Sequence, residues 1–113
     1  MDACVFCKIS AGEIPAKVVH RDEVVVAIED LNPQAPTHLL VMPAKHYGTI
    51  VDVSRAGDGL LGLIMEVAAN LGRARGGAGG FRVVVNTGAD GGQTVNHAHV
   101  HVLAGRPMSW PPG

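Results

Sequence analysis

Hydrophobic positions follow a two-residue spacing in some stretches of the chain and a helical spacing in one long stretch. The first two short β-rich runs are separated by three charged residues, 21–23, which is typical of a hairpin. Pro43 closes the third run, which is apolar throughout and indicates a buried strand. The predicted strands are 18–20, 24–28, 38–42, 81–85 and 97–103.

Helical spacing marks one long segment, 59–75. Its apolar residues recur at i, i+4, i+7, i+8 and i+11, so they share one face. They are Leu60, Ile64, Val67, Ala68 and Leu71. Asp58 is suited to cap the N-terminus of this helix, and the glycine-rich run 76–80 ends it. A short helix is also expected at 4–11.

Strands at hairpin spacings with one main helix between them predict an α+β fold. The expected sheet is largely antiparallel and five-stranded, and it is accompanied by the main helix and the short N-terminal helix. We find no internal repeat, and 113 residues suit one domain, 1–113. A domain of this size buries a modest fraction of its surface, so pairing with a second copy would stabilise it.

Composition and charge restrict the classes of function. Apolar residues make up 47% of the chain and charged residues 17%, which supports a folded core and argues against disorder. The net charge is −1, and the lysines and arginines are scattered, so no nucleic-acid partner is expected. No apolar run approaches the ~20 residues that cross a bilayer, and the N-terminus lacks the pattern of a signal peptide. We therefore expect a cytoplasmic protein with no membrane partner.

Three of the six histidines occupy every second position of the last predicted strand: His97, His99 and His101. Because strand side chains alternate between the two faces of a sheet, the three imidazoles should share one face. The apolar residues between them should share the other face and pack on the core.

This histidine array has several interpretations. Single strand histidines are usually surface or core residues, and a histidine cluster can also sense pH. At ~3.3 Å per residue, His97 and His101 lie ~13 Å apart, so one ion with ~2 Å bonds cannot comfortably reach all three rings. The remaining interpretation is covalent catalysis, in which a neutral imidazole attacks phosphorus through one nitrogen while its other nitrogen donates a proton to a fixed acceptor.

Cys4 and Cys7 are the only cysteines, and they are spaced as CxxC. Two cysteines do not form a disulfide scaffold. In a reducing compartment the spacing indicates metal or redox chemistry. A thioredoxin-like redox motif follows a strand, and none is predicted before Cys4, which weakens the redox interpretation.

The segment Gln93-Thr94-Val95-Asn96-His97-Ala98-His99-Val100-His101-Val102-Leu103 resembles the signature of the histidine-triad (HIT) superfamily, His-φ-His-φ-His-φ-φ. Trp110-Pro111-Pro112-Gly113 resembles the C-terminus of its HINT branch. Two further blocks match, Ile14-Pro15-Ala16-Lys17 and Pro33-Gln34-Ala35-Pro36-Thr37-His38. The resemblance covers nearly the whole chain, and it implies the HIT fold and a homodimer whose sheet extends across both copies.

The resemblance also implies an activity and the residues that perform it. HINT-like proteins are hydrolases that cleave the P–N bond of purine nucleoside phosphoramidates, and acyl-nucleotides, to a nucleoside monophosphate; no organic cofactor is implied. His99 would be the nucleophile, with its Nδ1–H held by the His101 backbone carbonyl. His101 would contact the phosphate or the leaving group, and His38 would hydrogen-bond His97 in a relay.

The implied substrate contacts fall into a base pocket, a ribose contact and a phosphate site. They are Ile14, Ile28 and Leu31 for the base, Asp30 for the ribose, and Asn86, Gly92 and Thr94 for the phosphate. Without the resemblance, Asp30 is equally a loop-capping residue. Trp110 would reach the partner subunit's site and influence leaving-group specificity. The preference between adenosine and guanosine is left open, because an apolar pocket contacts the flat face of a base.

Some microbial HIT proteins resemble this chain at its cysteines and use them to bind zinc. The matching positions are Cys4, Cys7, His46 and His97. A closed Cys2His2 site would be structural, with no open coordination position for substrate. His97 would bind zinc through one ring nitrogen and hydrogen-bond His38 through the other.

Two alternative functions remain. The first alternative is a zinc-stabilised nucleotide-binding module that acts through partner proteins. The second is a dinucleoside polyphosphate hydrolase of the same superfamily. The Trp-Pro-Pro-Gly tail favours the phosphoramidase.

Overall fold

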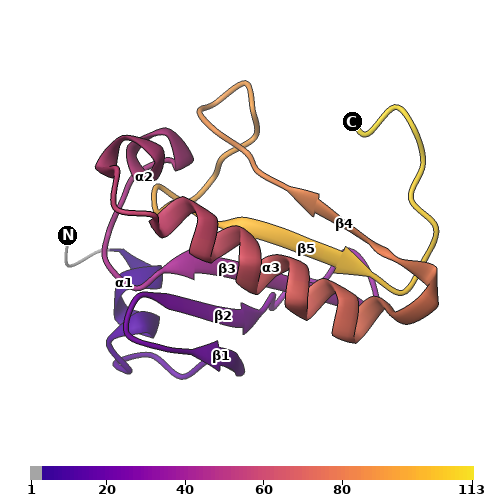
Figure 1. The fold of residues 1–113 in the computed structure, drawn as a ribbon, viewed down its shortest axis with the longest axis horizontal. Helices are drawn as coiled ribbons and strands as arrows, with labels where there is room; N and C mark the ends of the chain where they lie inside the picture. Colours follow the sequence, from indigo (N-terminus) through magenta and orange to yellow (C-terminus); the bar gives the residue numbers. More distant parts are fainter. Residues whose placement is uncertain (1–3) are drawn as a thin grey trace.

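The computed structural model describes residues 4–113. The expectation about a signal peptide rests partly on residues 1–3, which lie outside the described residues. Along the chain (Figure 1) the elements are α1 (Val5–Ser10), β1 (Val18–Arg21), β2 (Val25–Glu29), β3 (Thr37–Pro43), α2 (Ile50–Ala56), α3 (Leu60–Gly76), the 3-10 turn η1 (Gly77–Gly79), β4 (Phe81–Val84) and β5 (Val100–Ala104).

The strands form one open antiparallel sheet in the order β1-β2-β3-β5-β4. The sheet has α3 as its main helix and α1 as a short N-terminal helix, so the predicted α+β fold is confirmed. Between residues 4 and 113, no helix is long and apolar enough to span a membrane.

Helices pack on both faces of the sheet. On one face, which α3 crosses in Figure 1, Leu60, Ile64 and Ala68 pack against alternate residues of the central strands. On the other face, Phe6 and Ile9 of α1 pack against the intervening residues. The first strand set is Val25, Ala27, Leu39, Val41, Val100 and Val102, and the second is Val26, Ile28, Leu40 and Met42. The alternation explains why β2 and β3 are apolar at nearly every position.

The predicted apolar face of α3 is confirmed, with Val67 and Leu71 packed at its margin. The prediction of Asp58 as its N-cap is wrong by one residue, since the N-cap is Gly59 at φ 81°. Asp58 still contributes, because its carboxylate accepts the Leu60 backbone N–H at 3.1 Å.

Helix α2 was not predicted. It begins with a capping box, in which the Thr49 side chain accepts the Asp52 backbone N–H and the Asp52 carboxylate accepts the Thr49 backbone N–H. It ends at Gly57, whose φ of 68° is left-handed. Helix α2 buries only Val53, so its short sequence carries little periodic signal.

The last strand begins at Val100, whereas the sequence predicted a start at residue 97. Val100 forms the final register pair with Val41, and the Ala98 N–H instead donates to the Tyr47 carbonyl at 2.6 Å. The apolar side of the prediction is confirmed, because Ala98, Val100 and Val102 are buried in one cluster. His97 and His99 therefore lie in the segment that precedes β5, outside the sheet.

Candidate active site

His99 is nearly buried and stands just before β5. Its Nδ1 lies 2.7 Å from the His97 backbone oxygen. A carbonyl only accepts, so Nδ1 carries the proton and Nε2 holds the lone pair. The prediction that the His101 carbonyl holds this ring is wrong. His101 pairs within the sheet with Leu40 and Val84, whereas His97 precedes the sheet and its carbonyl turns to the His99 ring.

His101 is hydrogen-bonded to His38, with 2.9 Å between His101 Nδ1 and His38 Nε2. The predicted bond between His38 and His97 is therefore wrong. The β3–β5 register pairs His38 with Leu103 and Leu40 with His101, so the His38 and His101 rings are diagonal neighbours on one face of the sheet.

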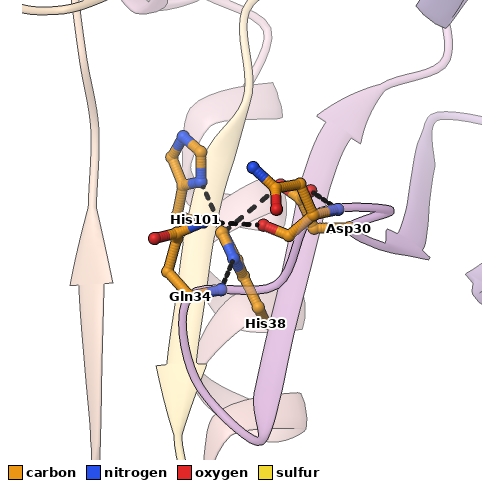
Figure 2. A network of polar contacts seen from close by, with 5 residues as sticks. Asp30, Gln34, His38 and His101 are labelled. Carbon is orange, nitrogen blue, oxygen red and sulfur yellow. Dashed lines mark hydrogen bonds and ion pairs between the residues drawn. The ribbon is translucent and has the colours of Figure 1, made fainter.

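The proton positions in this pair follow from the loop before β3. The Gln34 backbone N–H donates to His38 Nδ1 at 3.0 Å, so a neutral His38 carries its proton on Nε2 (Figure 2). His38 then donates to His101 Nδ1, and a neutral His101 carries its own proton on Nε2. The site thus combines a nucleophilic nitrogen on His99 with a proton donor on His101. The centroids of these two rings lie 5.0 Å apart.

Asp30 occupies the same network (Figure 2), with Oδ2 3.4 Å from His38 Nε2 and Oδ1 accepting the Asn32 N–H at 2.8 Å. It therefore caps the loop and faces His38. Oxygen and nitrogen atoms of Asp30, His38 and His101 lie close enough to hold a metal ion. The Gln34 N–H opposes that use, because it fixes the proton of a neutral His38 on the nitrogen that would bind the ion.

The pKa of His101 is lowered to about 4, mainly by burial and also by nearby His99 and His38, while Asp30 opposes the shift. Burial also lowers the pKa of His38, again against Asp30. Both rings are therefore neutral at pH 7, as the hydrogen-bond pattern requires.

His101 should make folding sensitive to acid. With a pKa of about 4 when folded and 6.5 as the ordinary value, the unfolded chain binds the proton more strongly between these values. Stability is thus complete above pH 6.5 and is lost as pH falls toward 4. We expect His101 to account for about 1–2 kcal/mol of the loss between pH 7 and pH 5, a value reduced for partial exposure. Urea unfolding of wild type and His101→Gln at both pH values tests this, and equal losses in the two proteins would contradict it.

An apolar pocket of about 290 Å³ lies beside this network and carries Asp30 on its wall. The structure brings Ile14, Ile28 and Leu31 together there. Leu31 is 98% exposed, which puts it at the rim. Sequence reasoning missed the contribution of α1, although its apolar positions were visible; the added lining residues include Val5, Phe6, Ile9 and Val95.

The three predicted phosphate contacts lie on or beside the glycine-rich turn between β4 and β5. Asn86 and Gly92 are neighbours, since a Cβ added to Gly92 would lie 3.9 Å from Asn86 Nδ2, and Thr94 is exposed two residues later. Gln93, to which no role was assigned, holds the turn. Its Oε1 accepts the Gly88 N–H at 3.0 Å, and its Nε2 donates to the Gly48 carbonyl at 2.7 Å and the Val95 carbonyl at 3.0 Å.

The same turn leaves no room for a side chain at residue 91. A Cβ on Gly91 would lie well inside van der Waals contact of the Thr87 backbone oxygen, which cannot rotate away. We expect Gly91→Ala to lower the free energy of unfolding by about 1–3 kcal/mol, as overpacking does. Gly79→Ala is the matched control, because nothing lies within 4 Å of its Cβ position. Denaturant titration compares them, and equal stabilities would refute the steric argument.

The structure does not place Trp110 at the active site of its own chain. The tail follows the last residue of β5 (Figure 1), whereas His99 precedes the first residue of that strand. Arg82 of β4 holds the tail by donating to the Ser109 carbonyl at 2.9 Å. Trp110 is 82% exposed there.

A second cluster, made of cysteine and histidine side chains, includes His97, two residues before His99. It contains Cys4, Cys7, His46 and His97, whose possible ligand atoms all lie within 4.8 Å of one another. Sulfur–nitrogen separations are 3.4 Å for Cys4 to His97 Nδ1, 3.5 Å for Cys7 to His97 Nδ1 and 3.2 Å for Cys7 to His46 Nδ1. A tetrahedral zinc with the usual bond lengths requires about 3.6 Å along such an edge. The donor types and spacing fit zinc.

The orientation of His97 suits a metal ligand. Its fully buried ring donates from Nε2 to the Pro43 carbonyl at 2.9 Å, which leaves the Nδ1 lone pair directed at the sulfurs. The prediction that this second nitrogen bonds His38 is wrong, because the carbonyl at the end of β3 takes that position. Burial, aided by Cys4, raises the pKa of the Cys7 thiol to about 11, so the thiolate form requires a compensating cation.

Comparison with known proteins identifies the family of this chain. A HIT domain family model matches residues 11–108. Protein HitA of Neisseria gonorrhoeae is 42% identical over 108 residues, with 96% of this chain and all of that protein covered. A 14 kDa zinc-binding protein of Zea mays is 45% identical over 112 residues, covering 96% and 87%. The crystal structure of a HIT family hydrolase from Legionella pneumophila is 50% identical with a TM-score of 0.91, covering 97% and 99%. The chain belongs to the HIT domain family.

Proposed function

We propose that the protein hydrolyses purine nucleoside phosphoramidates, and acyl-nucleotides, to a nucleoside monophosphate. The observation that carries this proposal is the fixed orientation of His99, whose Nδ1–H is held by the His97 carbonyl so that Nε2 presents a lone pair. The similar Legionella pneumophila protein is named a HIT family hydrolase, which supports hydrolysis as the general reaction.

In the first step, His99 Nε2 attacks the α-phosphorus and the P–N bond of the substrate breaks. The departing amine takes a proton from His101 Nε2. His38 orients His101 for this transfer, because its Nε2–H donates a hydrogen bond to His101 Nδ1.

In the second step, water attacks phosphorus and breaks the bond to His99 Nε2. The water proton passes to His101, and the nucleoside monophosphate leaves with His99 restored. Product release in two stages should give ping-pong behaviour.

The pocket assigns a part of the nucleotide to each group around His99. The apolar walls, from Ile14 and Ile28, would hold the flat purine, and Asp30 would accept hydrogen bonds from the two ribose hydroxyls. Asn86, Gly92 and Thr94 would contact phosphate, where a glycine-rich turn lets backbone N–H groups approach closely.

We also propose that zinc occupies the four-residue Cys/His cluster as a structural ion. Support comes from the tetrahedral spacing and from the zinc-binding Zea mays relative. Cys4, Cys7, His46 and His97 would hold it. Zinc there would tie the N-terminal segment to the end of β3 and to the segment before β5, and the reaction would not pass through it.

A homodimer is the proposed assembly. Strand β4 ends the sheet, and Phe81 and Val85 at this edge are each 40% exposed. A second copy that pairs along this edge would cover them and could place its Trp110 near the first copy's pocket. Light scattering with size-exclusion chromatography measures the mass in solution.

The deciding experiment compares an adenosine 5′-phosphoramidate with a diadenosine polyphosphate as substrates. Preferential turnover of the phosphoramidate supports the proposal. Preferential turnover of the polyphosphate would identify a dinucleoside polyphosphate hydrolase instead. AMP binding without turnover of either would identify the nucleotide-binding module that acts through partner proteins.

A further inference from the structure

Helix α1 and its N-cap contribute both to the Cys/His cluster and to the apolar pocket beside Asp30. Cys4 caps the helix, with its Sγ accepting the Cys7 N–H at 3.4 Å, and both cysteines contact the His97 ring nitrogen. Between them in sequence, Phe6 points to the apolar pocket. Helix α1 therefore carries metal ligands on one side and pocket walls on the other.

Phe6 also contacts the predicted nucleophile. Its ring meets the His99 ring edge-on, with centroids 5.2 Å apart and planes at 90°, and it meets the His97 ring at 5.8 Å. It is 7% exposed. A shift of α1 would therefore move the wall of the base pocket and uncover one side of His99.

Six residues are too few for a helix to be stable alone, so α1 depends on tertiary contacts. Apolar packing of Phe6 and Ile9 supplies part of them. Ser10 adds a hydrogen bond from its Oγ to the Ala44 carbonyl at 3.0 Å, and its own carbonyl accepts one from Arg21 at 2.7 Å. The two cysteines add contacts with His46 and His97. A bound zinc would join both ends of the first helical turn to His46 and His97.

From this arrangement we infer that occupancy of the Cys4–Cys7–His46–His97 site sets the affinity of the pocket for the nucleobase, with Phe6 as the positioning residue that links them. The inference rests on the proposed function. It concerns the base in particular, because Phe6 lines the base pocket, whereas Asp30 and the turn at 86–94 contain none of the four cluster residues.

The experiment compares two ligands in zinc-loaded and chelator-stripped protein. AMP carries the base, whereas ribose 5-phosphate carries only the sugar and phosphate. Calorimetric titration should show AMP binding weakened about tenfold or more by stripping, within the usual range of coupling between two sites. Ribose 5-phosphate affinity should change less than about twofold. Hydrogen exchange should become faster at the amides of residues 5–10.

Two leucine substitutions supply a matched pair of variants, Phe6→Leu in the pocket and Met65→Leu on the exposed side of α3. In loaded protein, Phe6→Leu should weaken AMP binding and leave ribose 5-phosphate unchanged, and stripping should then cost less additional AMP affinity than in wild type. Met65→Leu, on the exposed side of α3, should leave the ratio of the two affinities at its wild-type value. Circular dichroism checks that each protein is folded.

Loss confined to AMP, with faster exchange in α1, supports the inference. Equal weakening of both ligands would show general loosening and overturn it, as would unchanged AMP affinity after stripping or failure of the protein to take up zinc. Failure of loaded wild type to bind either ligand would instead overturn the proposed function, and this inference with it.

Discussion

Replacing His99 by alanine should lower turnover of an adenosine 5′-phosphoramidate by about 10⁴-fold or more, because the attacking nitrogen is lost. AMP affinity should stay within about threefold, since the base pocket and Asp30 are untouched. Steady-state kinetics with a fluorogenic amine leaving group, together with calorimetric AMP titration, measures both quantities.

His20→Ala is the matched control for this result. His20 lies on the β1–β2 hairpin and bonds Asp22 at 2.7 Å, outside the site. It should retain wild-type turnover. Residual activity of His99→Ala within tenfold of wild type would contradict the role of His99 as nucleophile, and loss of AMP binding in step with turnover would show that the substitution damaged the pocket.

Replacing Cys4 and Cys7 together by serine should abolish stoichiometric zinc binding and lower Tm by on the order of 10 °C. The cluster would otherwise tie α1 to two distant segments, and metal-binding free energy in such sites is folding free energy. Elemental analysis and thermal melts followed by circular dichroism measure the two effects.

The chelator response supplies the internal control for the cysteine variant. Wild-type Tm should fall when zinc is removed and recover when it is restored, whereas the serine variant should not respond. An equal Tm for the two proteins, or zinc retained by the variant, would contradict the assignment of these cysteines as ligands.

Much of the fold could be predicted because its signals are local and periodic. The apolar face of α3 and the alternating pattern of Ala98, Val100 and Val102 were readable from spacing alone. Helix α2 was missed because a seven-residue helix with one buried side chain has no periodic face, although its Thr49–Asp52 capping box was present in the sequence. The start of β5 was missed because the Ala98–Tyr47 backbone bond is not encoded in side-chain pattern.

The resemblance predicted which residues form the site, but it did not predict several of their hydrogen-bond partners. His38 meets His101 because of the β3–β5 register, and the Gln34 backbone amide fixes its proton. His97 and His99 bond to backbone carbonyls whose directions depend on where the strand begins and ends. Such partners follow from tertiary placement, which residue spacing does not specify.

The most direct test of the central claim is to trap the covalent intermediate. Wild-type protein is mixed with excess adenosine 5′-phosphoramidate, quenched in alkali within milliseconds to seconds, and analysed by intact mass and peptide mapping. The account predicts a single nucleotidyl group on His99, which forms and decays with the burst of amine release. Amine release with no adduct, or an adduct on a residue other than His99, would contradict it.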